Sequence, residues 1–270
     1  MSDSRAGEVA EAGRIDVEVD GVIAMVTLNH LGRLNALTVD MWRALGNVFN
    51  ELSANAALRC VVLRGAGGNF AAGADIREFP RERADREGVM HYHLRVIAPT
   101  LSAIHMCAHP VVAAIEGVCV GGGLEVACQC DVRIAGRSAR FGVPINRLGF
   151  PMAPDEMRGL LALVGKAATL EILLEGRVFD AIEAQAKGLL TRVVSDETVW
   201  DEALRSAQRI ARGAPLAARR NRRLADRLWP APPPLSDDEL RRFFDYADSQ
   251  DHRHGVEAFL AGTEPTFTGD

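Results

Sequence analysis

The sequence predicts an α/β fold in which most strands of the sheet are parallel. Two short apolar runs, Cys60–Leu63 and Val111–Ile115, have the length and composition of buried strands, and a glycine-rich turn lies beyond each of them. Segments with helical periodicity alternate with these strands along the chain. This order is typical of parallel strands that are joined by right-handed helical crossovers.

The chain begins with a short polar and acidic segment, residues 1–13, which we expect to be a disordered tail. Ile15–Val19 alternates apolar and polar residues, Asp20-Gly21 is a turn signal, and Val22–Leu28 is the expected return strand of a hairpin. Thr38 is a suitable N-cap for the first helix. One face of that helix carries the apolar residues Met41, Leu45, Val48, Phe49 and Leu52.

The middle of the chain contains a charged stretch, Pro80–Met90, which fits either a solvated helix or a mobile lid. Leu94–Met106 has helical periodicity, and Glu125–Cys130 is expected to open a further helix after the second glycine turn. Asp131–Ala135 and the shorter Ala139–Phe141 have the pattern of strands. These elements continue the alternation of strands and helices.

From Pro154 onward the chain is predicted to be largely helical. Leu160–Val164 and Ala168–Leu174 are expected helical segments, and Ala181–Lys187 is a helix that closes at Gly188. Leu189–Val194 is the last expected strand or extended segment of the sheet region.

The C-terminal part contains an amphipathic helix at Trp200–Ala211 and an arginine-rich helix at Ala217–Leu228. The arginines at 219, 220, 222 and 223 fit a solvated helix face, and a phosphate contact is the alternative. Trp229–Pro234 is a stiff proline-rich hinge. The pattern Ser236-Asp-Asp-Glu239 is a capping box that starts the final predicted helix.

Length and composition limit the possible classes of protein. The 270 residues suffice for one large domain with an appendage, and we expect a core over residues 14–199 and a helical region over residues 200–270. The net charge of −5 disfavours non-specific binding of nucleic acid. The five cysteines form no Cys-x-x-Cys pair, which predicts reduced thiols and no metal site. Without a signal peptide or a long apolar run, we expect a soluble cytoplasmic protein with no membrane partner.

The two glycine-rich turns carry the clearest chemical signal. They are Phe70-Ala-Ala-Gly-Ala-Asp-Ile76 and Gly121-Gly-Gly-Leu-Glu125. Turns of this kind present backbone N–H groups, and two such groups aimed at one point form an oxyanion hole that stabilises an enolate. Glu125 supplies a carboxylate beside the second turn. The sequence therefore predicts a polarising pocket next to an acid or base.

An ordered set of motifs resembles the enoyl-CoA hydratase/isomerase (crotonase) superfamily over roughly residues 15–268. The set comprises Leu34-Asn-Ala-Leu37, the two glycine turns, Phe141-Gly…Pro144, Glu175-Gly-Arg…Gly188-Leu189 and Asp251…Gly255…Ala258-Phe-Leu260. The resemblance implies a spiral of β-β-α units followed by a helical C-terminal region. It also implies a homotrimer or a dimer of trimers, and an acyl-CoA thioester substrate. Coenzyme A would then be part of the substrate, and no separate cofactor is expected.

The resemblance also implies roles for individual residues. The N–H groups of Ala72 and Gly122 would form the oxyanion hole, and Glu125 would be the catalytic carboxylate. The residues expected around the nucleotide are Gly73, Ala74, Asp75 and Ile76. Phe243 would approach the CoA from the C-terminal helix.

The sequence departs from the hydratase pattern at the position of a second glutamate. Ile145 follows Phe141-Gly…Pro144 at that point, and we expect it to line the acyl pocket. Asn146, Asp155 and Glu156 are candidates to replace the missing acid, although Asp155 and Glu156 also fit the start of a helix. A further departure is Gly262, which stands at a basic CoA-contacting position.

Three functional readings remain open from the sequence. The first is hydration of a 2-enoyl-CoA, with Glu125 as base. A double-bond isomerase, or a lyase or decarboxylase that uses one carboxylate, is the alternative. A different class is a non-catalytic acyl-CoA binding protein. His91 and His93, near the charged stretch, are expected to be solvated.

Overall fold

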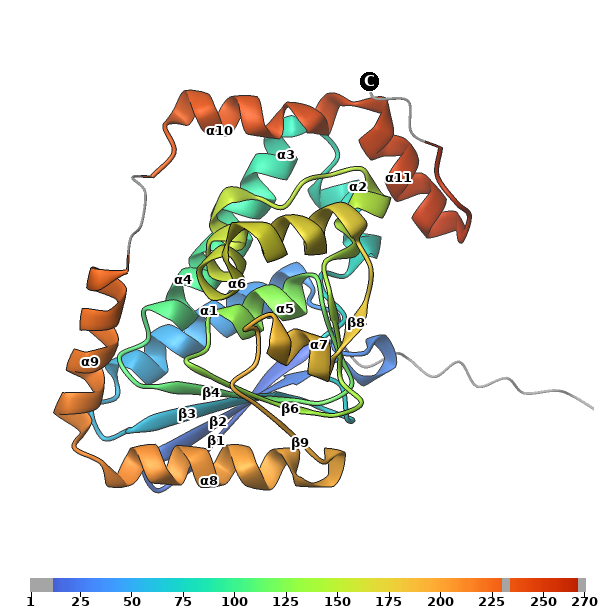
Figure 1. Ribbon diagram of the computed structural model, residues 1–270. Coiled ribbons are helices and arrows are strands. Elements are labelled where there is room, and N and C mark those ends of the chain that lie inside the picture. Colours follow the sequence, from blue (N-terminus) through green and yellow to red (C-terminus); the bar gives the residue numbers. More distant parts are fainter. Residues whose placement is uncertain (1–11, 230–233, 267–270) are drawn as a thin grey trace, which may run out of the picture.

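The computed structural model describes residues 12–229 and 234–266, and its main element is a six-stranded sheet. Figure 1 shows this sheet with helices on both sides. The strand order is β1-β2-β3-β4-β6-β9, with β1 antiparallel to β2 and all other neighbours parallel. The strands are β1 (Arg14–Asp20), β2 (Ile23–Asn29), β3 (Cys60–Gly65), β4 (Val111–Ile115), β6 (Val132–Gly136) and β9 (Arg192–Val194). The predicted α/β class and N-terminal hairpin are therefore confirmed.

A second sheet of three short strands lies beside the first and explains the spiral of β-β-α units. Its strands are β5 (Val118–Val120), β7 (Arg140–Gly142) and β8 (Phe179–Asp180). The sequence analysis missed β5, because only Glu116 and Gly117 separate it from β4. The units β4–β5 and β6–β7 each place one strand in each sheet, and each is followed by a helix.

Strand side chains alternate between two cores on the two faces of the large sheet. Val61 and Leu63 of β3 belong to the larger core, whereas Cys60 and Val62 belong to the smaller one. This period of two is the ordinary geometry of a strand. Because both faces are covered, the strands are continuous apolar runs, and this is the feature that revealed them in the sequence.

The larger core is covered by the helices that follow β2, β3 and β5. Helix α1 (Val39–Ala54) begins as predicted, with the Thr38 hydroxyl accepting a hydrogen bond from the Met41 N–H at 3.2 Å. It packs against α4 (Ala98–His105), where the Thr100 hydroxyl donates to the Trp42 carbonyl. The predicted helix at Leu94–Met106 is divided, since a π-helical segment (Tyr92–Ile97) precedes α4.

The charged stretch folds into two short helices, α2 (Phe79–Glu82) and α3 (Arg86–His91). Helix α5 (Gly122–Cys128) begins at the second glycine turn, three residues earlier than predicted. Helix α6 (Pro154–Glu175) spans both predicted helical segments and is kinked at Gly165, whose φ is +71°. Helix α7 (Ala181–Ala186) ends near Gly188 as expected.

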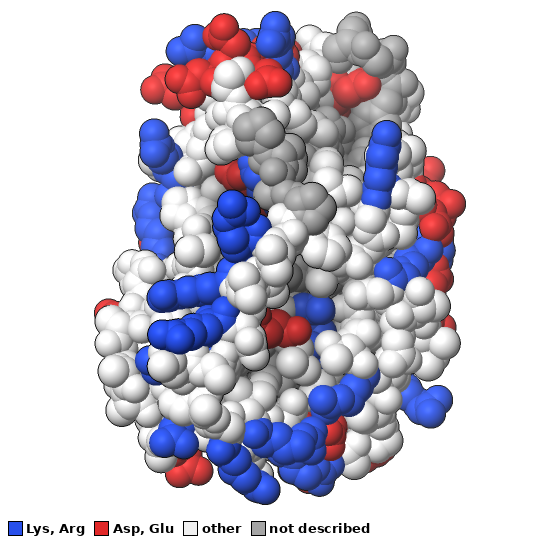
Figure 2. Space-filling view, turned by 60° about the vertical axis from the view of Figure 1, so that its left-hand side comes forward, with Lys and Arg blue, Asp and Glu red and all other residues white. Residues whose placement is uncertain are grey.

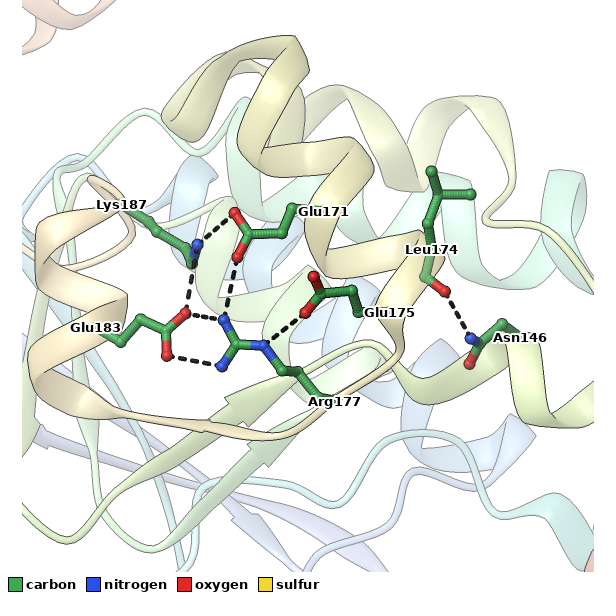
Figure 3. A network of polar contacts seen from close by, with 7 residues as sticks. All are labelled: Asn146, Glu171, Leu174, Glu175, Arg177, Glu183 and Lys187. Carbon is green, nitrogen blue, oxygen red and sulfur yellow. Dashed lines mark hydrogen bonds and ion pairs between the residues drawn. The ribbon is translucent and has the colours of Figure 1, made fainter.

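An ion-pair network joins the end of α6 to α7 on the surface (Figure 3). Its centre is Arg177, whose guanidinium contacts the carboxylates of Glu171, Glu175 and Glu183. Lys187 contacts Glu171 at 2.7 Å and Glu183 at 3.3 Å, which closes the network. These contacts fix the path of the chain between the two helices.

The Asn146 side chain is hydrogen-bonded in the same region, near the end of α6. Its side-chain N–H group donates to the Leu174 carbonyl at 3.0 Å, at the C-terminal end of α6 (Figure 3). Gly176 has a φ of +57°, and a Cβ placed there would lie 2.0 Å from the Asn146 Oδ1. Asn146 therefore caps a helix end, and the prediction that it replaces the missing acid is wrong.

Helix α8 (Val199–Arg212) lies against the outer face of the sheet (Figure 1). Val199, Ala203, Ala207 and Ala211 form the smaller core together with strand residues. The predicted boundary between a core of residues 14–199 and a helical region of residues 200–270 falls at the start of α8. It therefore separates this helix from the sheet on which it packs. The residues of the predicted tail are mostly outside the described part, and β1 begins immediately after Gly13.

The remaining helices extend along the side and top of the molecule (Figure 1). Helix α9 (Pro215–Leu228) is held by Arg222, which contacts the Asp131 carboxylate at 2.6 Å and the His105 carbonyl. Its arginines are therefore partly structural, where a solvated face was predicted. Figure 2 brings forward the side of the molecule that carries α9 in Figure 1. Basic side chains are spread over much of that side, and a group of acidic side chains lies at the height of α10.

The Ser236 capping box is present and starts α10 (Asp237–Phe243). This helix is not the final one as predicted, because α11 (Gln250–Ala261) follows it. Of the predicted proline-rich hinge, Trp229–Pro234, residues 230–233 lie outside the described residues. In the part of the chain that is described, no helix combines the length and apolarity needed to cross a bilayer.

Candidate active site

A cavity of about 270 Å³ lies where the glycine turns, the charged stretch and the start of α6 meet. Its walls come from segments that are far apart in the sequence, and Glu125 and Glu156 both line it. The other lining residues include Trp42, Ala72, Gly73, Ala74, Ile76, Phe79, Arg83, Tyr92, His93, Gly122, Ile145, Arg147, Phe150 and Phe259.

The first glycine turn is positioned by the loop that contains Asn35. This residue is fully buried, and its side chain donates to the carbonyls of Ala66 and Asn69 and accepts from the His30 N–H. Leu34, which precedes it, has a φ of +49°, and its carbonyl accepts a hydrogen bond from the Ala72 N–H at 2.9 Å. The Leu-Asn-Ala-Leu motif therefore holds the turn in place.

The same contacts correct one predicted residue of the oxyanion hole. The Ala72 N–H is already bonded to Leu34, so its assignment as a free donor is wrong. Leu37 pairs with Ala74 in a parallel bridge, donating to the Gly73 carbonyl and accepting from the Asp75 N–H. In a parallel pair, the N–H of the residue between these two groups points to the opposite side. The Ala74 N–H therefore points away from Leu37.

The Ala74 N–H faces the second glycine turn. A Cβ added to Gly122 would lie 3.4 Å from the Ala74 nitrogen, and one added to Gly73 would lie 3.4 Å from the Gly122 nitrogen. Across residues 12–229 and 234–266, neither nitrogen has a hydrogen-bond acceptor. Two free N–H groups thus lie side by side at the cavity wall, which is the arrangement expected of an oxyanion hole.

Glu125 lies in the first turns of α5 and is almost fully buried. Burial raises the pKa of its carboxyl group well above the usual range, and the nearby Glu156 carboxylate raises it further. The positive charge of Arg83 acts in the opposite direction. This direction of shift favours the protonated form of the carboxyl group, which suits Glu125 to give a proton rather than to take one.

Glu156 and His93 form a buried pair at the cavity. The His93 Nδ1 lies 2.5 Å from the Glu156 Oε1, and both side chains are at most 4% exposed. The prediction that His93 is solvated is wrong, because the π-helical segment turns it inward. Burial lowers the pKa of His93 despite the neighbouring carboxylate, so the ring is neutral at pH 7 and can donate one N–H to Glu156.

Glu156 also stabilises the start of a helix, which is the alternative role predicted for it. Its second carboxylate oxygen accepts a hydrogen bond from the Ala153 N–H at 3.4 Å. Asp155, by contrast, is about half exposed and pairs with Arg158 at 3.1 Å, so it does not reach the cavity. Of the candidates for a second acid, the structure therefore places Glu156 alone at the cavity.

Arg83, Tyr92 and Tyr246 were not recognised as site residues from the sequence. Arg83 and Tyr92 line the cavity, and Arg83 donates to the Tyr246 hydroxyl at 3.2 Å. That hydroxyl lies 3.5 Å from the His93 Nε2, and burial raises the pKa of Tyr246 to about 12. The charged stretch was the one available signal, since Arg83 belongs to it and lines the cavity.

The structure separates the remaining predicted residues into two groups. Ile145 and Ile76 line the cavity. Asp75 does not, and its carboxylate is paired with Arg77; burial acts to raise its pKa, but hydrogen bonds from Arg77 outweigh this and lower it. Phe243 meets Phe244 edge to face, with 5.1 Å between the ring centres, and does not line the cavity, whereas Phe259 does.

Comparison with known proteins identifies the family. A model of the enoyl-CoA hydratase/isomerase family matches residues 18–270. The chain is 32% identical to a Rhizobium meliloti protein named "Probable enoyl-CoA hydratase", over 93% of this chain and 96% of that one. It is also 32% identical to the short-chain-enoyl-CoA hydratase of Clostridium acetobutylicum, over 80% of this chain and 82% of that one.

Solved structures agree with this result. An "enoyl-CoA hydratase/carnithine racemase" from Magnetospirillum magneticum is 45% identical, with a TM-score of 0.79 over 96% of this chain and 97% of that chain. Methylmalonyl-CoA decarboxylase in complex with 2-nitronate-propionyl-CoA is 26% identical, with a TM-score of 0.85 over 95% of this chain and 99% of that chain. The chain therefore belongs to the enoyl-CoA hydratase/isomerase family, the crotonase superfamily of enzymes that act on CoA thioesters.

Proposed function

We propose that the protein hydrates a 2-enoyl-CoA, with Glu125 and Glu156 as the two carboxylates of the reaction. The observation that carries this proposal is that both side chains line one cavity, although the usual position of the second glutamate holds Ile145. Glu156 comes from the start of α6, eleven residues further along the chain. The acid/base pair that is incomplete in the sequence motif is thus supplied from another element.

The two free N–H groups of Ala74 and Gly122 bind the thioester oxygen. When a nucleophile adds to the double bond, negative charge gathers on this oxygen as an enolate. Backbone donors that are already oriented stabilise that charge without reorganisation, and losing one typically costs about 10²–10³ in rate. Ala74 replaces Ala72 in this role.

The proposed addition uses the carboxylates in different protonation states. Glu156, whose charge is oriented by His93, takes a proton from water while the water oxygen bonds to C3 of the acyl group. The electron pair of the double bond moves to the thioester oxygen, and the enolate collapses as Glu125 gives its proton to C2. Burial and the Glu156 charge raise the pKa of Glu125, which suits Glu125 to the role of the acid in such a division of roles.

A second candidate reaction uses one carboxylate. The likeness to methylmalonyl-CoA decarboxylase, with a TM-score of 0.85, favours an enolate that forms without attack by water. Glu125 alone would then protonate the enolate, as it also would in a double-bond isomerase.

Turnover of crotonyl-CoA and of its 3-enoyl isomer, followed at the absorbance of the conjugated thioester, separates these reactions. We expect loss of the signal with crotonyl-CoA, and abolition of that loss in Glu125→Gln. Gain of signal from the 3-enoyl substrate alone would show an isomerase and would contradict hydration. Binding of both thioesters without any turnover would show a binding protein.

The assembly, cofactor and location of the protein are part of the same proposal. We propose a homotrimer or a dimer of trimers, for which light scattering would give three or six times the mass of the 29.2 kDa protomer. Exposed apolar residues of α9, among them Leu216, Leu224 and Leu228, support an interface there. We also propose that catalysis needs no cofactor beyond the CoA of the substrate, and that the protein is cytoplasmic.

A further inference from the structure

Three polar side chains at the cavity have a buried atom without a hydrogen-bond partner. These atoms are the Trp42 Nε1, the Arg83 Nε and the Tyr92 hydroxyl, as judged over the described residues. All three are hydrogen-bond donors. A buried donor without an acceptor costs about 1–3 kcal/mol, so a group of three in one cavity indicates that a ligand supplies the acceptors.

Arg83 is the most informative of the three. The residue is only 6% exposed, and its guanidinium carbon lies 4.2 Å from the ring centre of Phe79 and 4.1 Å from that of Phe150. Arginine keeps its charge in proteins. A charge in such a place is normally paired with a carboxylate, because desolvation of an unpaired ion is costly.

No carboxylate of the described residues forms an ion pair with Arg83. Its guanidinium donates to the Tyr246 hydroxyl, which is neutral. Glu156, one of the two glutamates that line the cavity, has its two oxygens engaged by His93 and by the Ala153 N–H. Arg83 thus keeps a buried Nε–H group without an acceptor, in a cavity that is walled by aromatic rings.

We propose that Arg83 binds a free carboxylate of the substrate's acyl group, with the Tyr92 hydroxyl as a second donor. The substrate would then be the CoA monothioester of an unsaturated dicarboxylic acid. The proposal rests on the proposed function, because it assigns the substrate class of the same site. A planar guanidinium matches the two oxygens of a carboxylate, and a neutral alkyl group would leave all these donors unpaired.

The surroundings of Arg83 and Tyr92 support this assignment. Burial raises the pKa of Tyr92 far above neutrality, so its hydroxyl keeps the proton that it donates. Tyr92 packs against Phe79 at 5.8 Å between ring centres, and Phe79 also contacts Arg83. The two donors therefore share one aromatic wall, which excludes water and strengthens a charged hydrogen bond.

A bound carboxylate would also act on the catalytic acid. The charge of Arg83 lowers the pKa of Glu125, opposing the effects of burial and of Glu156. A carboxylate paired with Arg83 neutralises this influence, so Glu125 holds its proton to a higher pH in the complex. Binding of the expected substrate class thereby prepares the proton that the reaction uses.

The test compares two thioesters that differ in one charge. The first is a trans-2-enedioyl-CoA monothioester with five or six carbons in the acyl group, and the second is its methyl ester. For the unmodified enzyme we expect kcat/KM to be about 10- to 100-fold higher for the free acid, the range expected of a charge-assisted hydrogen bond. Equal values, or a preference for the ester, would overturn the proposal.

Variants then assign the preference to Arg83. In Arg83→Met the ratio of the two kcat/KM values should fall to about 1, and Arg83→Lys should retain part of it. Arg147→Gln is the matched control, because Arg147 also lines the cavity but is exposed. It should leave the ratio unchanged. A ratio that persists in Arg83→Met would show that another group binds the carboxylate.

A binding experiment keeps this proposal separate from the proposed function. If neither thioester is hydrated, hydration fails, but the Kd values of the saturated dioyl-CoA monothioester and its methyl ester can still be compared by calorimetry. Tighter binding of the acid that is lost in Arg83→Met would support carboxylate recognition without hydration. Equal Kd values would refute it, whatever the outcome for hydration.

Discussion

Replacing Glu156 by Gln tests the assignment of the second carboxylate most directly. The amide keeps an oxygen that accepts from His93, at the position where the carboxylate oxygen lies 2.5 Å from the His93 Nδ1. It removes the basic group that is proposed to take the proton from water. General base catalysis contributes about 10²–10⁴ in rate, so we expect kcat for hydration to fall by this factor, or by about 2.7–5.4 kcal/mol in activation free energy.

The effect on stability should be small in Glu156→Gln and large in Glu156→Ala. Gln loses at most the long hydrogen bond from the Ala153 N–H, which is 3.4 Å, and we expect a cost below about 1.5 kcal/mol. Ala leaves both His93 and the Ala153 N–H buried without an acceptor. At about 1–3 kcal/mol for each such group, the free energy of unfolding should fall by about 2–6 kcal/mol.

The assay combines steady-state hydration with urea unfolding of both variants. The pH profile adds a second signature, because removing the Glu156 charge lowers the pKa of Glu125. The limb of the profile at which activity declines with rising pH should therefore move to lower pH in Glu156→Gln. Hydration within threefold of the unmodified enzyme, at unchanged stability, would refute Glu156 as the base and leave it as a helix cap.

Three further predictions concern other parts of the site and fold. In Gly122→Ala the new Cβ would lie 2.8 Å from the Trp42 ring and 3.4 Å from the Ala74 nitrogen, so kcat/KM should fall at least about 10²-fold. The control is Gly32→Ala, whose new Cβ meets no atom within 4 Å. Equal activity of the two variants would contradict the oxyanion hole. The folded protein holds the Glu125 proton more tightly than the unfolded chain does, in which the pKa of Glu125 is near 4.5. The contribution of Glu125 to the free energy of unfolding is therefore present below pH 4.5 and declines by up to about 1.4 kcal/mol per pH unit above it. Urea titrations should show that Glu125→Gln removes this slope, and parallel pH dependences of the variant and the unmodified protein would refute the raised pKa. Asp131→Asn should lower the free energy of unfolding by about 1–3 kcal/mol, because Asp131 accepts from the Val111 N–H at 2.7 Å and pairs with the partly buried Arg222. The hydration kinetics should stay unchanged, and a loss of activity at equal stability would place α9 in the site.

The sequence alone determined the elements of the fold and the family. Strands such as β3 and β4 are continuous apolar runs because both faces of the sheet are covered, and this pattern is local. Thr38, Ser236 and Gly188 mark helix ends through contacts within a few residues. Element boundaries failed where a signal was too short or was interrupted, as at β5 and at the Gly165 kink.

The tertiary structure decided which groups lie together at the candidate site. The choice of Ala74 over Ala72 depends on pairing with the loop at Leu34–Leu37, and the pairing of Glu156 with His93 joins residues 63 positions apart. The sequence could not show that Arg83 is buried without a carboxylate, since a charged stretch usually faces water. Local patterns specify where the backbone forms helices and strands, whereas the burial and the electrostatic coupling that set a side chain's chemistry arise only when distant segments pack around one cavity.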